Sequence, residues 1–85
     1  MSPPRVEPTV EIHGYALRLI REARGRKVAD LAQALGVDRS YVAKIELGHS
    51  RKVSKVLYAR ILAELQIDDY RALLAVAPAR EDAVA

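Results

Sequence analysis

The sequence predicts an all-α fold, a compact domain of five helices. Apolar residues recur every three or four positions along most of the 85 residues, which is the period of an amphipathic helix. No segment alternates apolar and polar residues with period two for long enough to predict a strand. Residues typical of helix ends separate the periodic stretches, namely Gly25, Gly36, Gly48 and Pro78.

The predicted domain covers residues 10–77, and its first helix begins near Val10 and ends at Gly25, a C-cap glycine. Its apolar face is broad and consists of Ile12, Ala16, Leu17, Ile20 and Ala23. Residues 1–9 hold three of the four prolines and few groups to bury, which predicts a flexible N-terminal arm. Residues 78–85 are predicted to form a flexible C-terminal tail.

Two short helices follow, over residues 28–35 and 39–47. The start of the first is poorly signalled, because a lysine at position 27 is a poor N-cap beside the positive end of a helix. Gly36 ends this helix and can adopt the left-handed conformation of a tight turn. Asp38 is a good N-cap for the next helix and is expected to accept hydrogen bonds from its first N–H groups.

The last two predicted helices cover residues 55–66 and 69–77. Ser54 is the N-cap of the first, and its apolar residues recur four positions apart at Val53, Leu57, Ile61 and Leu65. Asp68 is the predicted N-cap of the fifth helix, which carries an apolar stripe of Tyr70, Leu73 and Leu74 and ends before Pro78.

The positive charge is concentrated in the middle of the chain. Residues 18–60 contain eleven basic and four acidic residues, a net charge of +7, whereas the two ends together carry three basic and seven acidic residues. A basic middle between acidic ends favours a polyanionic partner. A solvated helical surface that happens to be rich in arginine explains the same distribution, so both interpretations stay open on charge alone.

The composition argues against several other classes of protein. No cysteine is present for disulfides or thiolate metal sites, and no apolar run approaches the length of about 20 residues that spans a bilayer. The N-terminus lacks the apolar stretch of a signal peptide, so a cytoplasmic protein is expected.

Catalysis is not expected either. His13 and His49 lie 36 positions apart without a clustered acidic partner, and the serines at positions 40, 50 and 54 have no histidine in a triad-like arrangement. No glycine-rich phosphate loop is present. We therefore expect no enzymatic activity, no cofactor, no metal and no small-molecule ligand.

One segment is more specific. LAQALGVDRSYVAKIELG, residues 31–48, resembles the Cro/repressor-type (Xre-like) helix-turn-helix family in a Leu-Ala pair, a Leu-Gly-Val turn, a polar cap and an ending of Ile-Glu-x-Gly. The likeness extends to Gly14, to RLIREARG (18–25) and to RILAEL (60–65), and covers roughly residues 12–74. The resemblance implies a lambda-repressor-like domain in which helices 2 and 3 form the helix-turn-helix and helix 3 enters the major groove of DNA.

The resemblance also implies roles for individual residues. Val42 and Ile45 would anchor helix 3, which leaves four side chains to contact bases: Arg39, Ser40, Ala43 and Lys44. Contacts to phosphate would come from Arg26, Lys27, Tyr41, His49, Ser50, Arg51, Lys52 and Lys55. Arg21 and Glu46 occupy the positions of a structural salt bridge. A homodimer is expected, with an interface formed by Tyr70, Leu73 and Leu74.

Two positions depart from the family pattern. The family commonly begins helix 2 with an apolar residue, Ser or Thr, and then a Gln that contacts phosphate, whereas this chain has Arg26, Lys27 and Val28. The two basic residues would replace that contact electrostatically. Leu47 is apolar where the family usually has a polar residue, so it is either partly exposed or in contact with a partner chain.

The function implied by the resemblance is sequence-specific binding of double-stranded DNA by a transcriptional regulator. The type expected is a small dimeric repressor of the phage Cro/immunity kind on an inverted-repeat operator. An antitoxin autoregulator or a controller of restriction–modification genes would bind DNA in the same way. The alternative is a protein-interaction module, which keeps the fold without specific DNA recognition. Arg39, Lys44 and the basic loop after helix 3 argue against it.

Overall fold

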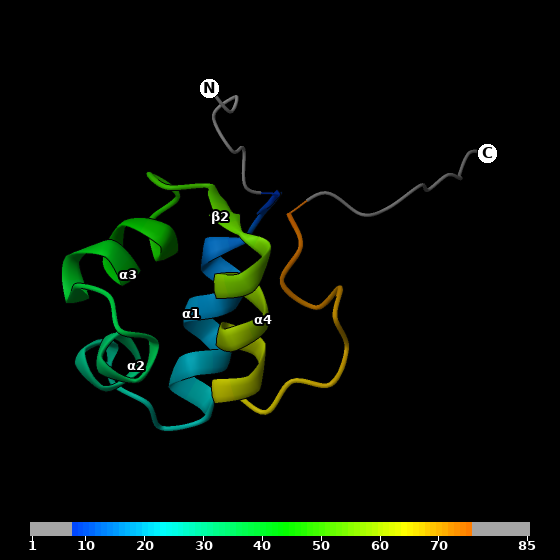
Figure 1. Ribbon diagram of the computed structural model, residues 1–85. Coiled ribbons are helices and arrows are strands. Elements are labelled where there is room, and N and C mark those ends of the chain that lie inside the picture. The colour runs from blue at the N-terminus through cyan, green and yellow to red at the C-terminus, as the bar shows by residue number, and fades with distance from the viewer. Residues whose placement is uncertain (1–7, 76–85) are drawn as a thin grey trace.

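Four helices and two short strands make up residues 8–75, the part of the chain that this computed structural model describes. In order they are β1 (Thr9–Glu11), α1 (Gly14–Ala23), α2 (Val28–Leu35), α3 (Arg39–Glu46), β2 (Lys52–Ser54) and α4 (Lys55–Glu64). Helix α2 packs against α3 and α4, and α3 also packs against α1 (Figure 1). The predicted tail and nearly all of the predicted arm lie outside the described residues.

Helix α1 begins four residues later than predicted, at Gly14. His13 is its N-cap, and the imidazole Nδ1 accepts a hydrogen bond of 3.2 Å from the backbone N–H of Ala16. A Cβ atom at Gly14 would overlap the backbone carbonyl of Ile45, so only glycine allows α1 to lie this close to the end of α3. The start of α1 therefore fixes the position of α3.

The turn between α2 and α3 agrees with the sequence prediction. Gly36 has φ 74° and ψ 30°, the left-handed conformation, and the N–H of Val37 donates to the carbonyl of Ala32 over 3.0 Å. Lys27 makes no capping hydrogen bond with its side chain, as its poor propensity predicts. Asp38 has the backbone conformation of an N-cap, but the capping bond expected from its side chain is absent.

The expectation that every element is helical is wrong, because β1 and β2 form an antiparallel pair. Thr9 pairs with Ser54, Val10 with Val53 and Glu11 with Lys52. Strands of three residues are too short to show a period of two, so the sequence pattern does not reveal them. Val53 is 2% exposed and belongs to the core, which attaches the strand pair to the domain.

A fifth helix is also absent from the residues that the structure describes. Positions 69–75 form turns and then an extended segment beside β1, in which Ile12 bridges to Leu74 and the N–H of His13 donates to the carbonyl of Leu73 over 2.7 Å. The carboxylate of Asp69 accepts from the backbone N–H of Arg71 over 2.9 Å, a local bond that competes with helix formation.

The core lies where α1, α4 and the α2–α3 pair meet, and it also receives β2 and the C-terminal segment. Its buried members are Ile12, Leu17, Leu31, Ala32, Leu35, Val42, Ile45, Val53, Tyr58, Ile61, Leu62, Leu65 and Leu73. Within residues 8–75, no helix has the length and apolar character needed to cross a membrane.

Candidate nucleic-acid interface

The two sides of α3 differ in burial. Val42 and Ile45 are each 1% exposed and pack into the core. Arg39, Ser40 and Lys44 are exposed and Ala43 is half-buried, so these four predicted base contacts lie away from the core. The core therefore holds α3 by one side and leaves a short donor-rich surface on the other.

The ion pair between Arg21 and Glu46 ties α3 to α1. The guanidinium donates to the two carboxylate oxygens over 2.6 Å and 3.1 Å, and also to the backbone carbonyl of Arg26 over 2.7 Å. Both side chains are almost fully buried. The hydrogen bond to Glu46 raises the pKa of Arg21, burial opposes this effect, and the charges of Glu46 and Glu22 add to it. This one side chain connects the end of α3 with the loop that leads into α2.

Three arginines of the basic middle are directed to helix ends within the domain. Arg24 donates through Nε to the carbonyl of Leu65 over 2.9 Å, and Arg60 donates to the carbonyl of Ala34 over 3.1 Å. These carbonyls lie at helix C-termini, where the macrodipole favours a cation. Sequence reasoning missed this role, because the contacts join residues 26 to 41 positions apart.

Arg26, which was predicted to contact phosphate, is the third of them, and its side chain is bound within the domain. Its guanidinium donates to the backbone carbonyl of Glu64 over 2.9 Å and to the Glu64 carboxylate over 3.1 Å. The side chain thus holds the C-terminus of α4 and is occupied within the domain. Of the two basic residues that were expected to replace the family's glutamine, Lys27 is the exposed one.

The other predicted phosphate contacts lie on the α3–β2 loop, on β2, at the start of α4 and on α3 itself. Lys52 and Lys55 are exposed, like Lys27, and the three form no ion pair with any residue in the range 8–75. Arg51 is also exposed and lies 3.4 Å from the Glu11 carboxylate, a loose surface ion pair. His49 is exposed, whereas Ser50 and Tyr41 are half-buried.

The predicted dimer interface is only partly available. Leu73 has no exposed surface and packs in the core, so it cannot contact a partner chain, and Leu74 is half-buried beside β1. Tyr70 is 46% exposed, and its ring meets that of Tyr58 edge to face, with 5.1 Å between the ring centroids. The three residues do not form the predicted apolar stripe, because residues 69–75 are not a helix.

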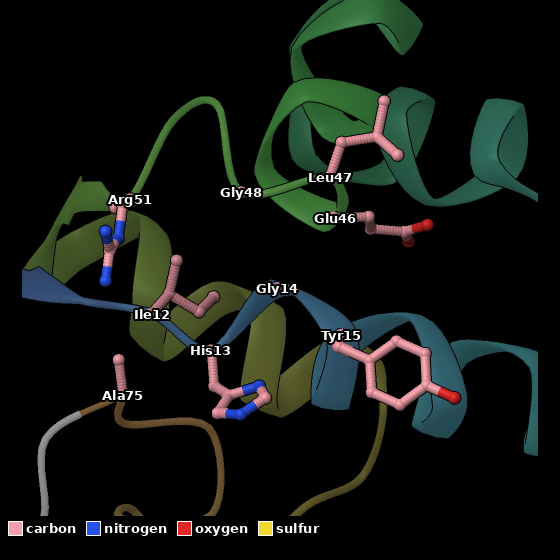
Figure 2. A pocket seen from close by; sticks show the side chains of 9 residues that line it. All are labelled: Ile12, His13, Gly14, Tyr15, Glu46, Leu47, Gly48, Arg51 and Ala75. Carbon is pink, nitrogen blue, oxygen red and sulfur yellow. The ribbon is translucent and has the colours of Figure 1, made fainter.

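A shallow pocket of about 300 Å³ lies between the start of α1 and the end of α3. Figure 2 shows His13 just before α1 and Tyr15 on it, Glu46 and Leu47 at the end of α3, and Arg51 on the loop before β2. Leu47 is 64% exposed in the single chain, so its side chain is free for either solvent or a partner chain. The volume of the pocket is at the lower end of the range for ligand pockets.

Comparison with known proteins agrees with this geometry. Residues 14–76 match a family model described as a helix-turn-helix domain. The chain belongs to the Xre-like helix-turn-helix family. Among solved structures of this type, the restriction-modification controller protein C.AhdI from Aeromonas hydrophila is 37% identical, with a TM-score of 0.63 over 71% of this chain and 88% of that one.

Two further relatives extend the comparison. The structure of SinR, a master regulator for biofilm formation solved in complex with DNA, has a TM-score of 0.64 over 69% of this chain and 95% of that one. At 24% identity this likeness shows the fold alone. A protein from Methanocella arvoryzae named as an HTH-type transcriptional regulatory protein is 42% identical over 48 residues. The match spans 56% of this chain and 15% of that protein.

Proposed function

We propose that this protein is a transcriptional regulator that binds specific sequences of double-stranded DNA with α3 in the major groove. The observation that carries the proposal is the division of α3, whose apolar residues are locked in the core while Arg39, Ser40 and Lys44 are exposed. An arginine can donate to the O6 and N7 atoms of guanine, a lysine can do the same or contact phosphate, and Ala43 offers a methyl group to thymine.

The surrounding basic side chains would hold the phosphate backbone. Lys27 precedes α2, and Arg51, Lys52 and Lys55 follow α3, so positive charge lies before and after the helix-turn-helix. His49, Ser50 and Tyr41 would add polar contacts in the same region. Phosphate contacts set the position of the protein on the duplex, while base contacts set the sequence. Arg26 has no part in this proposal, because its guanidinium is hydrogen-bonded to Glu64.

The finer proposal is a homodimeric repressor on an inverted-repeat operator. A single eight-residue helix reaches few base pairs, and a second copy related by two-fold symmetry doubles the contacts. Exposed Tyr70 and half-buried Leu74 are the members of the predicted stripe that a partner chain can reach. The likeness to C.AhdI favours control of restriction–modification genes over the phage Cro/immunity type.

The test is a selection of bound duplexes from a random pool. Wild type is compared with Arg39→Ala/Lys44→Ala and with Arg18→Ala/Arg71→Ala, a control that removes the same charge from exposed ion pairs elsewhere. We expect wild type and the control to enrich one inverted repeat, and the α3 variant to lose it. Enrichment of a single half-site would contradict the dimer. Absence of enrichment from folded wild-type protein would overturn DNA recognition in favour of a protein-interaction module.

A further inference from the structure

Asp38 differs from the two other N-cap residues whose side chains can accept a hydrogen bond, His13 and Ser54. His13 and Ser54 accept hydrogen bonds from backbone N–H groups of their own helices, over 3.2 Å and 3.0 Å. Asp38 has the same extended backbone, with φ −69° and ψ 146°, yet its side chain makes no capping bond. It is exposed and forms no ion pair with any residue in the range 8–75. Its carboxylate is therefore not engaged by the fold.

The position of this carboxylate is unusual for a surface acid. It directly precedes Arg39 and Ser40, and the exposed charged residues of α3 itself, Arg39 and Lys44, are both basic. The other carboxylate of α3, on Glu46, is buried and bound in both oxygens by Arg21. Among the described residues of α3 and its caps, Asp38 thus offers the one acceptor-only group that is exposed.

A carboxylate at a DNA-contacting surface can bind only where the DNA presents a donor. Phosphates repel it, and the guanine edge in the major groove presents only acceptors. The amino groups N4 of cytosine and N6 of adenine are the donors there, and aspartate characteristically pairs with cytosine N4. Approach to a guanine or thymine edge instead leaves the carboxylate desolvated without a donor, so the wrong base is penalised.

We propose that Asp38 is a specificity-determining residue that accepts a hydrogen bond from cytosine N4 at, or one base pair from, the guanine bound by Arg39. Consecutive Cα atoms are about 3.8 Å apart and base pairs rise by about 3.4 Å, so the two side chains reach the same or adjacent pairs. A single G·C pair presents the acceptors for Arg39 and the donor for Asp38 together. This inference rests on the proposed function, in which α3 enters the major groove.

The experiment repeats the duplex selection with Asp38→Ala and Asp38→Asn. Asp68→Ala is the control, since it removes one exposed carboxylate outside the helix-turn-helix. For Asp38→Ala we expect the preference for cytosine in one column to fall roughly tenfold while the guanine column persists. For Asp38→Asn the same column should change towards adenine, because an amide pairs with adenine N6 and N7. Circular dichroism should show unchanged helix content, since no capping bond is lost.

Each result decides the proposal. A changed column in the Asp38 variants, with the wild-type sequence kept by Asp68→Ala, supports it. An unchanged sequence in every column for both Asp38 variants overturns it and leaves the proposed function intact. Wild-type protein that is folded but enriches nothing overturns the proposed function and this inference together.

Discussion

Gly14 sets the distance between α1 and α3, because its side chain is only a hydrogen atom. The backbone of Ile45 and Glu46 lies against its Cα, where a side chain would overlap it. Gly25 has open space around it but adopts φ 71°. The two glycines are required for different reasons, one for close packing and one for its backbone conformation.

Gly14→Ala is therefore expected to destabilise the domain more than Gly25→Ala. The first variant forces backbone apart, which costs about 3 kcal/mol or more. The second only places an alanine in the left-handed region, at about 1–2 kcal/mol. Urea unfolding followed by circular dichroism measures both. Equal losses of unfolding free energy would contradict the close contact between α1 and α3.

At the scale of elements, the sequence predicts best where a local signal suffices. Helix α2 and the Gly36 turn follow from periodicity and one glycine, and α3 ends within one residue of its prediction. The strand pair escapes because its two halves are over forty residues apart and three residues long. The burial of Val42 beside exposed Arg39 follows from periodicity. The hydrogen bond from Arg26 to Glu64 joins residues far apart in the chain, so no local pattern predicts it. The absence of a capping bond from the Asp38 side chain likewise depends on three-dimensional placement.

Tyr58 on α4 explains why the C-terminal segment forms turns instead of a fifth helix. Its hydroxyl donates to the carbonyl of Tyr70 and accepts from the N–H of Leu73, at 3.2 Å in the second case. The ring is fully buried. Burial raises the pKa of Tyr58, the hydrogen bond with the Leu73 backbone lowers it, and the charges of Tyr70 and Asp69 raise it further.

Tyr58→Phe should lower the free energy of unfolding by about 1–3 kcal/mol at pH 7, because it leaves backbone groups of the segment without partners. In the wild type, the raised pKa means that the unfolded chain loses this proton first, so stability falls as pH rises above about 10. The variant should lack this part of the alkaline loss. Urea titrations between about pH 7 and 11 measure both effects, with Tyr15→Phe as control, because Tyr15 is exposed on α1. An identical alkaline profile in Tyr58→Phe would refute the assignment.

For the whole molecule, the net charge of the middle segment overstates what a partner can contact. Arg21, Arg24, Arg26 and Arg60 hold the helices to one another. The basic residues left exposed around the helix-turn-helix are Lys27, Arg39, Lys44, Arg51, Lys52 and Lys55. Part of the positive charge of the basic middle is therefore structural, and these six exposed residues are the part that a polyanionic partner could contact.

Lys52→Ala/Lys55→Ala tests the second group through salt dependence. Each phosphate contact removed should reduce the magnitude of the slope of log affinity against log salt by about 0.9. The selected sequence should stay the same, because phosphate contacts do not specify bases. Fluorescence anisotropy with a labelled duplex gives the slopes, at salt concentrations from about 50 to 300 mM, a range in which counterion release is measurable. A slope equal to that of wild type would exclude these lysines from the backbone contact.

The extended segment beside β1 also determines how the domain responds to a pulling force. The backbone carbonyl of Glu11 accepts a hydrogen bond from the N–H of Ala75 over 2.9 Å. The chain therefore enters and leaves the described fold on adjacent, antiparallel backbones (Figure 1). Tension applied at both ends loads these bonds one after another, first at Ala75 and then at Leu73. The segment would unzip from β1 at low force, while the helix-turn-helix, which lies outside this path, would keep its shape until later.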